Sequence, residues 1–138
     1  MRRILAAAVA TAAATACVGA APLAAADPVP GPPYIDHVEW AKWGDLSSLR
    51  VYPTAAGRAA AARLRTGDQA AEAWAEVLRL SPDAELPGMH EQFACHWQLA
   101  EFAQPGKVSW NLEPWRPEVD ATDMLAAACN PGGTEEPF

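Results

Sequence analysis

The chain has 138 residues, a formal net charge of −7 at pH 7, three cysteines and six tryptophans. Its acidic balance argues against binding to nucleic acid, whose phosphates it would repel. No stretch after residue 26 approaches the run of about 18 apolar residues that a membrane span needs. We therefore expect a mature chain without a transmembrane segment and without a nucleic-acid partner.

The N-terminus has the pattern of a secretory signal peptide. Arg2 and Arg3 give a positive start, residues 4–16 are apolar, and Ala24-Ala25-Ala26 offers the small residues that a signal peptidase reads. We predict cleavage after Ala26 and secretion, with or without attachment to the cell envelope. Removing these 26 residues leaves 112, and the loss of two arginines and no acid changes the charge from −7 to −9. The two arginines also fit twin-arginine export, so the export route stays open.

The cysteines predict one disulfide. Cys17 lies inside the predicted signal peptide, which leaves Cys95 and Cys129 as two thiols in an oxidising compartment, where they are expected to pair. Closing this 34-residue separation should stabilise the fold by about 3 to 4 kcal/mol. The alternative is lipidation of Cys17, but lipoprotein cleavage sites usually have leucine where Ala14 stands.

The first part of the mature chain predicts a leader followed by a hairpin. Residues 27–33 contain four prolines and are expected to be extended. The globular domain is expected to cover residues 34–130, with residues 131–138 as a polar tail. Its first two strands, 34–43 and 48–52, are rich in aromatic and β-branched residues and are joined at Gly44-Asp45.

Two helices are predicted next. Thr54 is expected to cap a first helix that runs to about Arg65, and Asp68 to cap a second that ends at Ser81-Pro82. The second helix has one apolar stripe and one polar face that we expect toward water: Ala70, Trp74, Val77 and Leu78 form the stripe, and Glu72, Glu76 and Arg79 form the polar face.

The remaining elements are a third helix over 89–103, a strand over 107–113 and a short helix over 121–129 capped by Asp120. The strand alternates cleanly, with Val108, Trp110 and Leu112 on one face and Lys107, Ser109, Asn111 and Glu113 on the other. The order of elements predicts a small α+β fold: a mostly antiparallel sheet of about three strands covered by three to four helices. Trp74, Trp97 and Trp110 lie on apolar faces and are expected in the core.

Four blocks of the mature sequence carry a family resemblance. They are Val51-Tyr52-Pro53-Thr54-Ala55-Ala56-Gly57-Arg58, Gln92-Phe93-Ala94-Cys95-His96-Trp97, Trp110-Asn111-Leu112-Glu113-Pro114-Trp115-Arg116-Pro117 and Cys129-Asn130-Pro131-Gly132-Gly133. Together they resemble a family of small secreted actinobacterial proteins catalogued as domain of unknown function 2599. The resemblance covers nearly all of residues 34–138. It implies export and a paired cysteine, and brings no activity or catalytic residues.

A weaker resemblance links the chain to the bacterial subtilisin inhibitors. The shared features are size, secretion, the Pro-Thr-Ala-x-Gly stretch at residues 53–57 and a late cysteine pair. That resemblance would place a reactive bond at Cys95-His96-Trp97. The second disulfide of that family and its usual proline are missing, and the helix predicted over 89–103 would leave no exposed loop there.

Gln92 and His96 are the first candidate site. They lie four residues apart within the apolar arc of the third helix, where polar side chains need partners. The favoured interpretation is a core pair that hydrogen-bonds backbone, and the alternative is a ligand pocket with one base and one amide.

The second candidate follows the last strand. Asn111 and Glu113 are predicted to point away from the core, beside an accessible Trp115 and Arg116, which is an arrangement suited to stacking on a sugar. The alternative is that Trp115 closes the edge of the sheet. Glycoside hydrolysis needs a second carboxylate, and the sequence identifies none for Glu113.

The third candidate is a basic surface. Residues 46–67 contain Arg50, Arg58, Arg63 and Arg65 and no acid, within an otherwise acidic chain. These arginines suit either an ordinary solvated helix face or contact with an anionic envelope polymer or lipid head group.

No pattern for catalysis or for a cofactor accompanies these candidates. His37, His90 and His96 have no metal-ligand spacing, and the sequence has neither a Gly-x-Ser-x-Gly elbow nor a phosphate-binding glycine loop. We therefore expect no cofactor and no metal. The prediction is a secreted, non-enzymatic binding or interaction module of the cell envelope or medium, whose partner would be an envelope polymer or another protein. The alternatives are a hydrolase of envelope glycan or peptide and a protease inhibitor.

Overall fold

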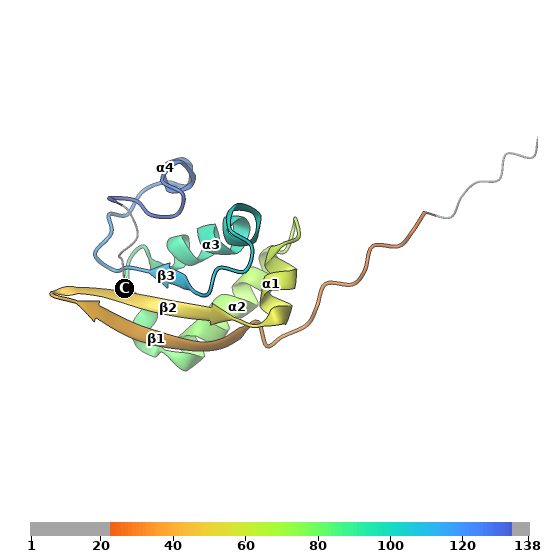
Figure 1. Ribbon diagram of the computed structural model, residues 1–138, viewed down its shortest axis with the longest axis horizontal. Helices are drawn as coiled ribbons and strands as arrows, with labels where there is room; N and C mark the ends of the chain where they lie inside the picture. The colour runs from red at the N-terminus through yellow and green to blue at the C-terminus, as the bar shows by residue number, and fades with distance from the viewer. Residues whose placement is uncertain (1–22, 134–138) are drawn as a thin grey trace, which may run out of the picture.

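The computed structural model describes residues 23–133, so most of the predicted signal peptide and the end of the predicted tail lie outside the described residues. Residues 23–33 form neither helix nor strand and run away from the folded body in Figure 1. The elements that follow are β1 (Ile35–Trp43), β2 (Leu46–Pro53), α1 (Ala55–Ala61), α2 (Gly67–Leu80), the 3-10 turn η1 (Pro82–Ala84), α3 (Met89–Ala103), β3 (Trp110–Leu112) and α4 (Ala121–Ala126). This is the predicted α+β class.

The three strands form one antiparallel sheet in the order β1-β2-β3. β1 and β2 are the predicted hairpin, turned at Gly44, whose φ of 57° is in the left-handed region that glycine adopts readily. Leu49 pairs with Leu112 and Val51 with Trp110, and all four side chains are buried. α1, α2 and α3 contribute to the same core cluster as these residues, so the helices share one face of the sheet (Figure 1).

Aromatic rings form the centre of that core. Phe93 of α3 lies between Trp74, Trp97 and Trp110, with ring centroids 5.4, 6.3 and 6.1 Å away. Tyr34 meets the edge of Trp97 at 5.7 Å. Of the three tryptophans expected in the core, Trp97 and Trp110 are buried, and Trp74 is partly buried and packs against the core cluster. Such edge and tilted contacts add to the gain from burying the rings.

The turn before α1 holds the start of the sheet. The hydroxyl of Thr54 caps α1 by accepting the N–H of Gly57 and donates to the Pro33 carbonyl, and the N–H of Thr54 donates to the Tyr34 carbonyl. A Cβ on Gly57 would stand 2.1 Å from the carbonyl oxygen of Tyr34. Only glycine therefore permits this contact.

The predicted boundary between the first two helices needs correction. α1 ends at Ala61 instead of near Arg65, and Arg65 has a left-handed φ of 62°, which interrupts the helical path. α2 begins at Gly67 after Thr66, so Asp68 lies in its first turn and is not its cap. The predicted apolar stripe of α2 does pack against the core.

Glu76 of α2 was predicted to face water and is buried. One of its oxygens accepts the N–H groups of both Tyr34 and Ile35, each at 2.7 Å. The edge strand β1 begins there, and the carboxylate satisfies two backbone donors that no strand pairs. Burial raises the pKa of the Tyr34 hydroxyl, and the charges of Glu72 and Glu76 raise it further.

The last predicted strand and helix are shorter than expected. Only residues 110–112 pair with β2, and Val108, expected on the core face, is 74% exposed. Residues 107–109 follow the turn at Gly106 and lie outside the sheet. The Val108 carbonyl accepts a hydrogen bond from Arg58 instead of from a strand. α4 has the predicted Asp120 cap but ends at Ala126, before two left-handed residues, Ala128 and Cys129.

Candidate functional site

Two of the predicted site residues, Gln92 and Glu113, meet inside the protein. The side-chain amide of Gln92 pairs with the backbone of Glu113 at both ends: its Nε2 donates to the Glu113 carbonyl and its Oε1 accepts the Glu113 N–H, each at 2.9 Å. The amide therefore acts as a strand partner for the residue that follows β3.

The Glu113 carboxylate and Arg116 form an ion pair at 2.7 Å, and both side chains are 0% exposed. Ser48 donates its hydroxyl to the other carboxylate oxygen at 2.9 Å. Arg116 also donates to the carbonyls of Pro131 and Gly133. We call the side chains of Ser48, Gln92, Glu113 and Arg116 the buried polar network. It anchors the last described residues to the sheet.

Asn111 and Glu113 lie on the predicted face of the strand, but the prediction that they remain accessible is wrong, because both are buried. Residues 113–116 and 131–133 bond to one another through Arg116 and cover this end of the sheet. The side-chain oxygen of Asn111 accepts the Ser109 hydroxyl at 2.7 Å. Alternation correctly gave the face of the strand, but the return of the C-terminal segment over that face has no local sequence signal.

Trp115 is half-buried at the border of the network. Its indole N–H donates to the Ser47 carbonyl at 3.1 Å, and the Arg116 guanidinium lies 4.6 Å from its ring centroid. One face of the indole is therefore already in contact with a cation. A sugar would have only the remaining surface for stacking.

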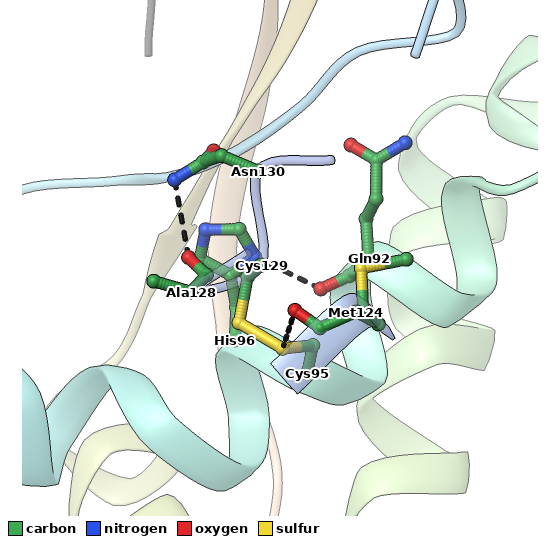
Figure 2. The surroundings of a disulfide bond; sticks show 7 residues. All are labelled: Gln92, Cys95, His96, Met124, Ala128, Cys129 and Asn130. Atoms are coloured by element: carbon green, nitrogen blue, oxygen red, sulfur yellow. Dashed lines mark hydrogen bonds between the residues drawn. A yellow bond between two sulfur atoms is a disulfide. The ribbon is translucent and has the colours of Figure 1, made fainter. Parts of the chain in front are cut away.

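His96 does not face the amide of Gln92. Its Nδ1 donates to the backbone carbonyl of Gln92 at 2.9 Å, as Figure 2 shows, and the residue is buried. His96 lines a cavity of about 250 Å³ with Cys129 and Asn130. The bond to the backbone is the one expected for a structural histidine.

Cys95 and Cys129 form the predicted disulfide, with their Cα atoms 5.5 Å apart. Figure 2 shows the bond joining α3 to the loop after α4. Cys95, Met124 and Cys129 make a small second hydrophobic cluster, against which Leu99 and Val119 pack. The disulfide thus fixes α4 on the side of α3.

The four arginines of the predicted basic surface divide into separate places. Arg50 lies on β2, on the face opposite Leu49 and Val51. Arg58 of α1 binds Glu101 at 2.7 Å and the Val108 carbonyl. Arg63 and Arg65 belong to the turn between α1 and α2, where they line one groove together.

That groove is the site that sequence reasoning missed. It has a volume of about 440 Å³ and runs between the α1–α2 turn, α3 and Leu125 of α4. Three large apolar side chains on it are exposed: Leu64 at 83%, Phe102 at 54% and Leu125 at 47%. The described residues that line it include no acid. We call it the α3 groove. One signal was available: on a helical wheel Phe102 lies directly beside Cys95, so the apolar face of the third helix is wider than its core-facing residues require.

The described residues have neither a cluster of metal ligands nor a helix that could span a membrane. Within residues 23–133, no group of three or more His, Cys, Asp or Glu side chains is placed to hold a metal ion. In the same part of the chain, no helix combines the length and apolar character needed to cross a membrane.

Known proteins resemble this chain over most of its length. It is 62% identical over 112 residues to uncharacterized protein Rv0477 of Mycobacterium tuberculosis (strain ATCC 25618 / H37Rv), an alignment that covers 80% of this chain and 74% of the relative. It is 50% identical over 105 residues to uncharacterized protein ML2452 of Mycobacterium leprae (strain TN), covering 75% and 83%. No solved structure matches it. The family described as "Protein of unknown function (DUF2599)" matches residues 35–132, and the chain belongs to that family.

Proposed function

We propose that this protein is an exported, non-enzymatic binding module whose binding surface is the α3 groove. The observation that carries the proposal is the groove itself. Leu64, Phe102 and Leu125 are exposed and line one hollow of about 440 Å³, which is within the usual range for ligand sites of about 300 to 1,000 Å³. Exposed apolar side chains gathered in one hollow are typical of binding surfaces.

The disulfide supports export. Disulfides form and persist in oxidising compartments, and Cys95–Cys129 ties α3 to the loop after α4. Expression of the full chain in a mycobacterial host, followed by mass spectrometry of the medium, tests this. The expected species begins at Asp27 and has no free thiol. A species that begins at a diacylated Cys17 contradicts cleavage after Ala26, and an unprocessed chain found only inside the cell contradicts export.

The buried polar network supports binding over hydrolysis. A hydrolase built on Glu113 would need that carboxylate to reach substrate. The Glu113 side chain has no exposed surface, and its carboxylate forms an ion pair with Arg116. A protease inhibitor built on Cys95-His96-Trp97 would need an extended loop, but these residues lie in the middle of α3 and are buried. Both alternatives would require large rearrangements of packed residues.

The neutral fluorescent probe N-phenyl-1-naphthylamine tests the groove independently of charge. The purified, disulfide-bonded protein should enhance its fluorescence, and Phe102→Ser should reduce that enhancement strongly. Val108→Ser is the control, since Val108 is also an exposed apolar residue, at 74%, and is not part of the α3 groove. Equal loss in both variants, or no loss in Phe102→Ser, would show that the probe binds elsewhere.

A further inference from the structure

We infer that the α3 groove takes a single-chain amphiphile with an anionic head group, such as a long-chain fatty carboxylate. The head would lie at Arg63 and Arg65, and the chain would run along α3 toward α4. This inference rests on the proposed function of the groove and adds the chemical class of its ligand.

The apolar path is longer than the groove alone. A second hollow of about 170 Å³ lies between α3 and α4 and reaches Val119 and Met124. The two hollows share Ala94, Gln98 and Leu125 in their linings, so they adjoin along α3. Two neighbouring, mostly apolar hollows in a row suit an extended hydrocarbon chain better than a compact ligand.

Charge gives the path a direction. Arg63 and Arg65 line the first hollow, which contains no acid among its described residues, whereas Glu91 lines the second. The chain as a whole is acidic, with a net charge of −7. An anionic head group is therefore attracted to the arginine end and repelled from the Glu91 end.

The arginine end is held in place by the core. The hydroxyl of Thr66 accepts the indole N–H of buried Trp97 at 3.0 Å and donates to the Arg63 carbonyl at 3.2 Å. Arg65 sits in the left-handed backbone conformation that closes this turn. The backbone that carries both guanidinium groups is thus anchored before any ligand arrives, which reduces the ordering that binding requires.

One arginine already holds an oxygen acceptor. Arg63 Nη1 donates to the backbone carbonyl of Asp27 in the leader at 2.5 Å. A carboxylate would offer this guanidinium a charged acceptor in place of a neutral one, and its two oxygens can accept two parallel N–H bonds from the guanidinium. Binding of the anionic head is expected to release Asp27 from Arg63.

Calorimetry with three dodecyl compounds tests the head group. Laurate, dodecyltrimethylammonium and dodecyl maltoside share one chain length and differ in charge. Below their micelle concentrations, the disulfide-bonded protein should bind laurate at least about tenfold more tightly than the other two, a difference of about 1.4 kcal/mol. The preference should weaken in 1 M salt, which screens the exposed arginines.

Substitutions locate the head. The double variant Arg63→Gln/Arg65→Gln should lose the preference for laurate and still bind dodecyl maltoside. Arg79→Gln is the control, because Arg79 is an exposed arginine of α2 that is not part of either hollow. An unchanged preference in the double variant would overturn the inference.

Other outcomes separate this inference from the proposed function. Equal affinity for all three dodecyl compounds, with the naphthylamine probe still bound, overturns the anionic head group and leaves the binding groove intact. If neither the probe nor the amphiphiles bind, both the inference and the proposed function are overturned. Binding to vesicles that contain phosphatidylglycerol, without binding to monomeric laurate, replaces the single-chain ligand with a membrane surface.

Discussion

The buried polar network and the α3 groove differ in which side chains they bury: the network buries charged side chains, and the groove exposes apolar ones. The network places a glutamate and an arginine with no exposed surface at the end of the sheet. The groove places a leucine and a phenylalanine more than half exposed beside two arginines. The residue types that suggest chemistry are therefore structural here, and apolar residues that suggest a core form the candidate binding surface.

The difference has a physical cause. A buried ion pair is tolerated only when its geometry is good and its remaining donors and acceptors are satisfied. Arg116 and Glu113 meet this condition with Ser48, Pro131 and Gly133. Exposed apolar surface, by contrast, is unfavourable in water unless a ligand or partner covers it. Variants should therefore affect stability at the network and binding at the groove.

The largest effect is expected from breaking the buried ion pair. Glu113→Ala removes the buried carboxylate that Arg116 pairs with and should lower the free energy of unfolding by about 3 to 5 kcal/mol. Urea denaturation followed by tryptophan fluorescence measures this. The control is the double variant Glu113→Leu/Arg116→Met, which removes both charges and should be less destabilised than Glu113→Ala. If Glu113→Ala unfolds like the wild type and loses a hydrolytic activity, Glu113 is catalytic.

The disulfide should give the next largest effect. Cys95→Ala/Cys129→Ala should lower the free energy of unfolding by about 3 to 4 kcal/mol through the entropy gained by the unfolded chain. This variant should also weaken binding of the naphthylamine probe, because Leu125 of α4 lines the groove and the disulfide holds the end of α4 to α3. Unchanged probe binding in the folded variant would mean that α4 is positioned without the disulfide.

Local signals in the sequence predicted most of the fold. The hairpin, the caps at Thr54 and Asp120, the bounds of the third helix and the disulfide are all confirmed. Each depends on residues close in sequence or, for the disulfide, on there being two cysteines in the mature chain. The class of the fold followed from the order of these elements.

The features that could not be predicted from the sequence depend on contacts between residues that are distant along the chain. Glu76 was placed in water because its helix position is polar, but its partners are backbone donors 41 and 42 residues away. Glu113 was placed on an open face, but residues 131–133 return to cover it. The α3 groove combines the α1–α2 turn with two helices. No periodicity in one element contains that information.

A smaller but specific loss is expected at Gly57. In Gly57→Ala the new methyl group would overlap the Tyr34 carbonyl oxygen, which belongs to backbone and cannot move aside cheaply. The free energy of unfolding should fall by about 1 to 3 kcal/mol. Gly67→Ala is the matched control, since a Cβ at Gly67 has no neighbour within 4 Å. Thermal unfolding of both variants should separate them clearly, and equal melting temperatures would contradict the close approach of α1 to β1.

The smallest change in stability is expected on the groove itself. Leu64 is 83% exposed, so Leu64→Ser removes little buried area and should alter the free energy of unfolding by no more than about 0.5 kcal/mol. The same substitution should weaken binding of the naphthylamine probe, because Leu64 lines the hollow between the two arginines. Denaturation and probe titration on one preparation measure both quantities. A clear loss of stability with unchanged probe binding would mean that Leu64 contributes to packing and not to binding. The contrast between the network and the groove would then not hold.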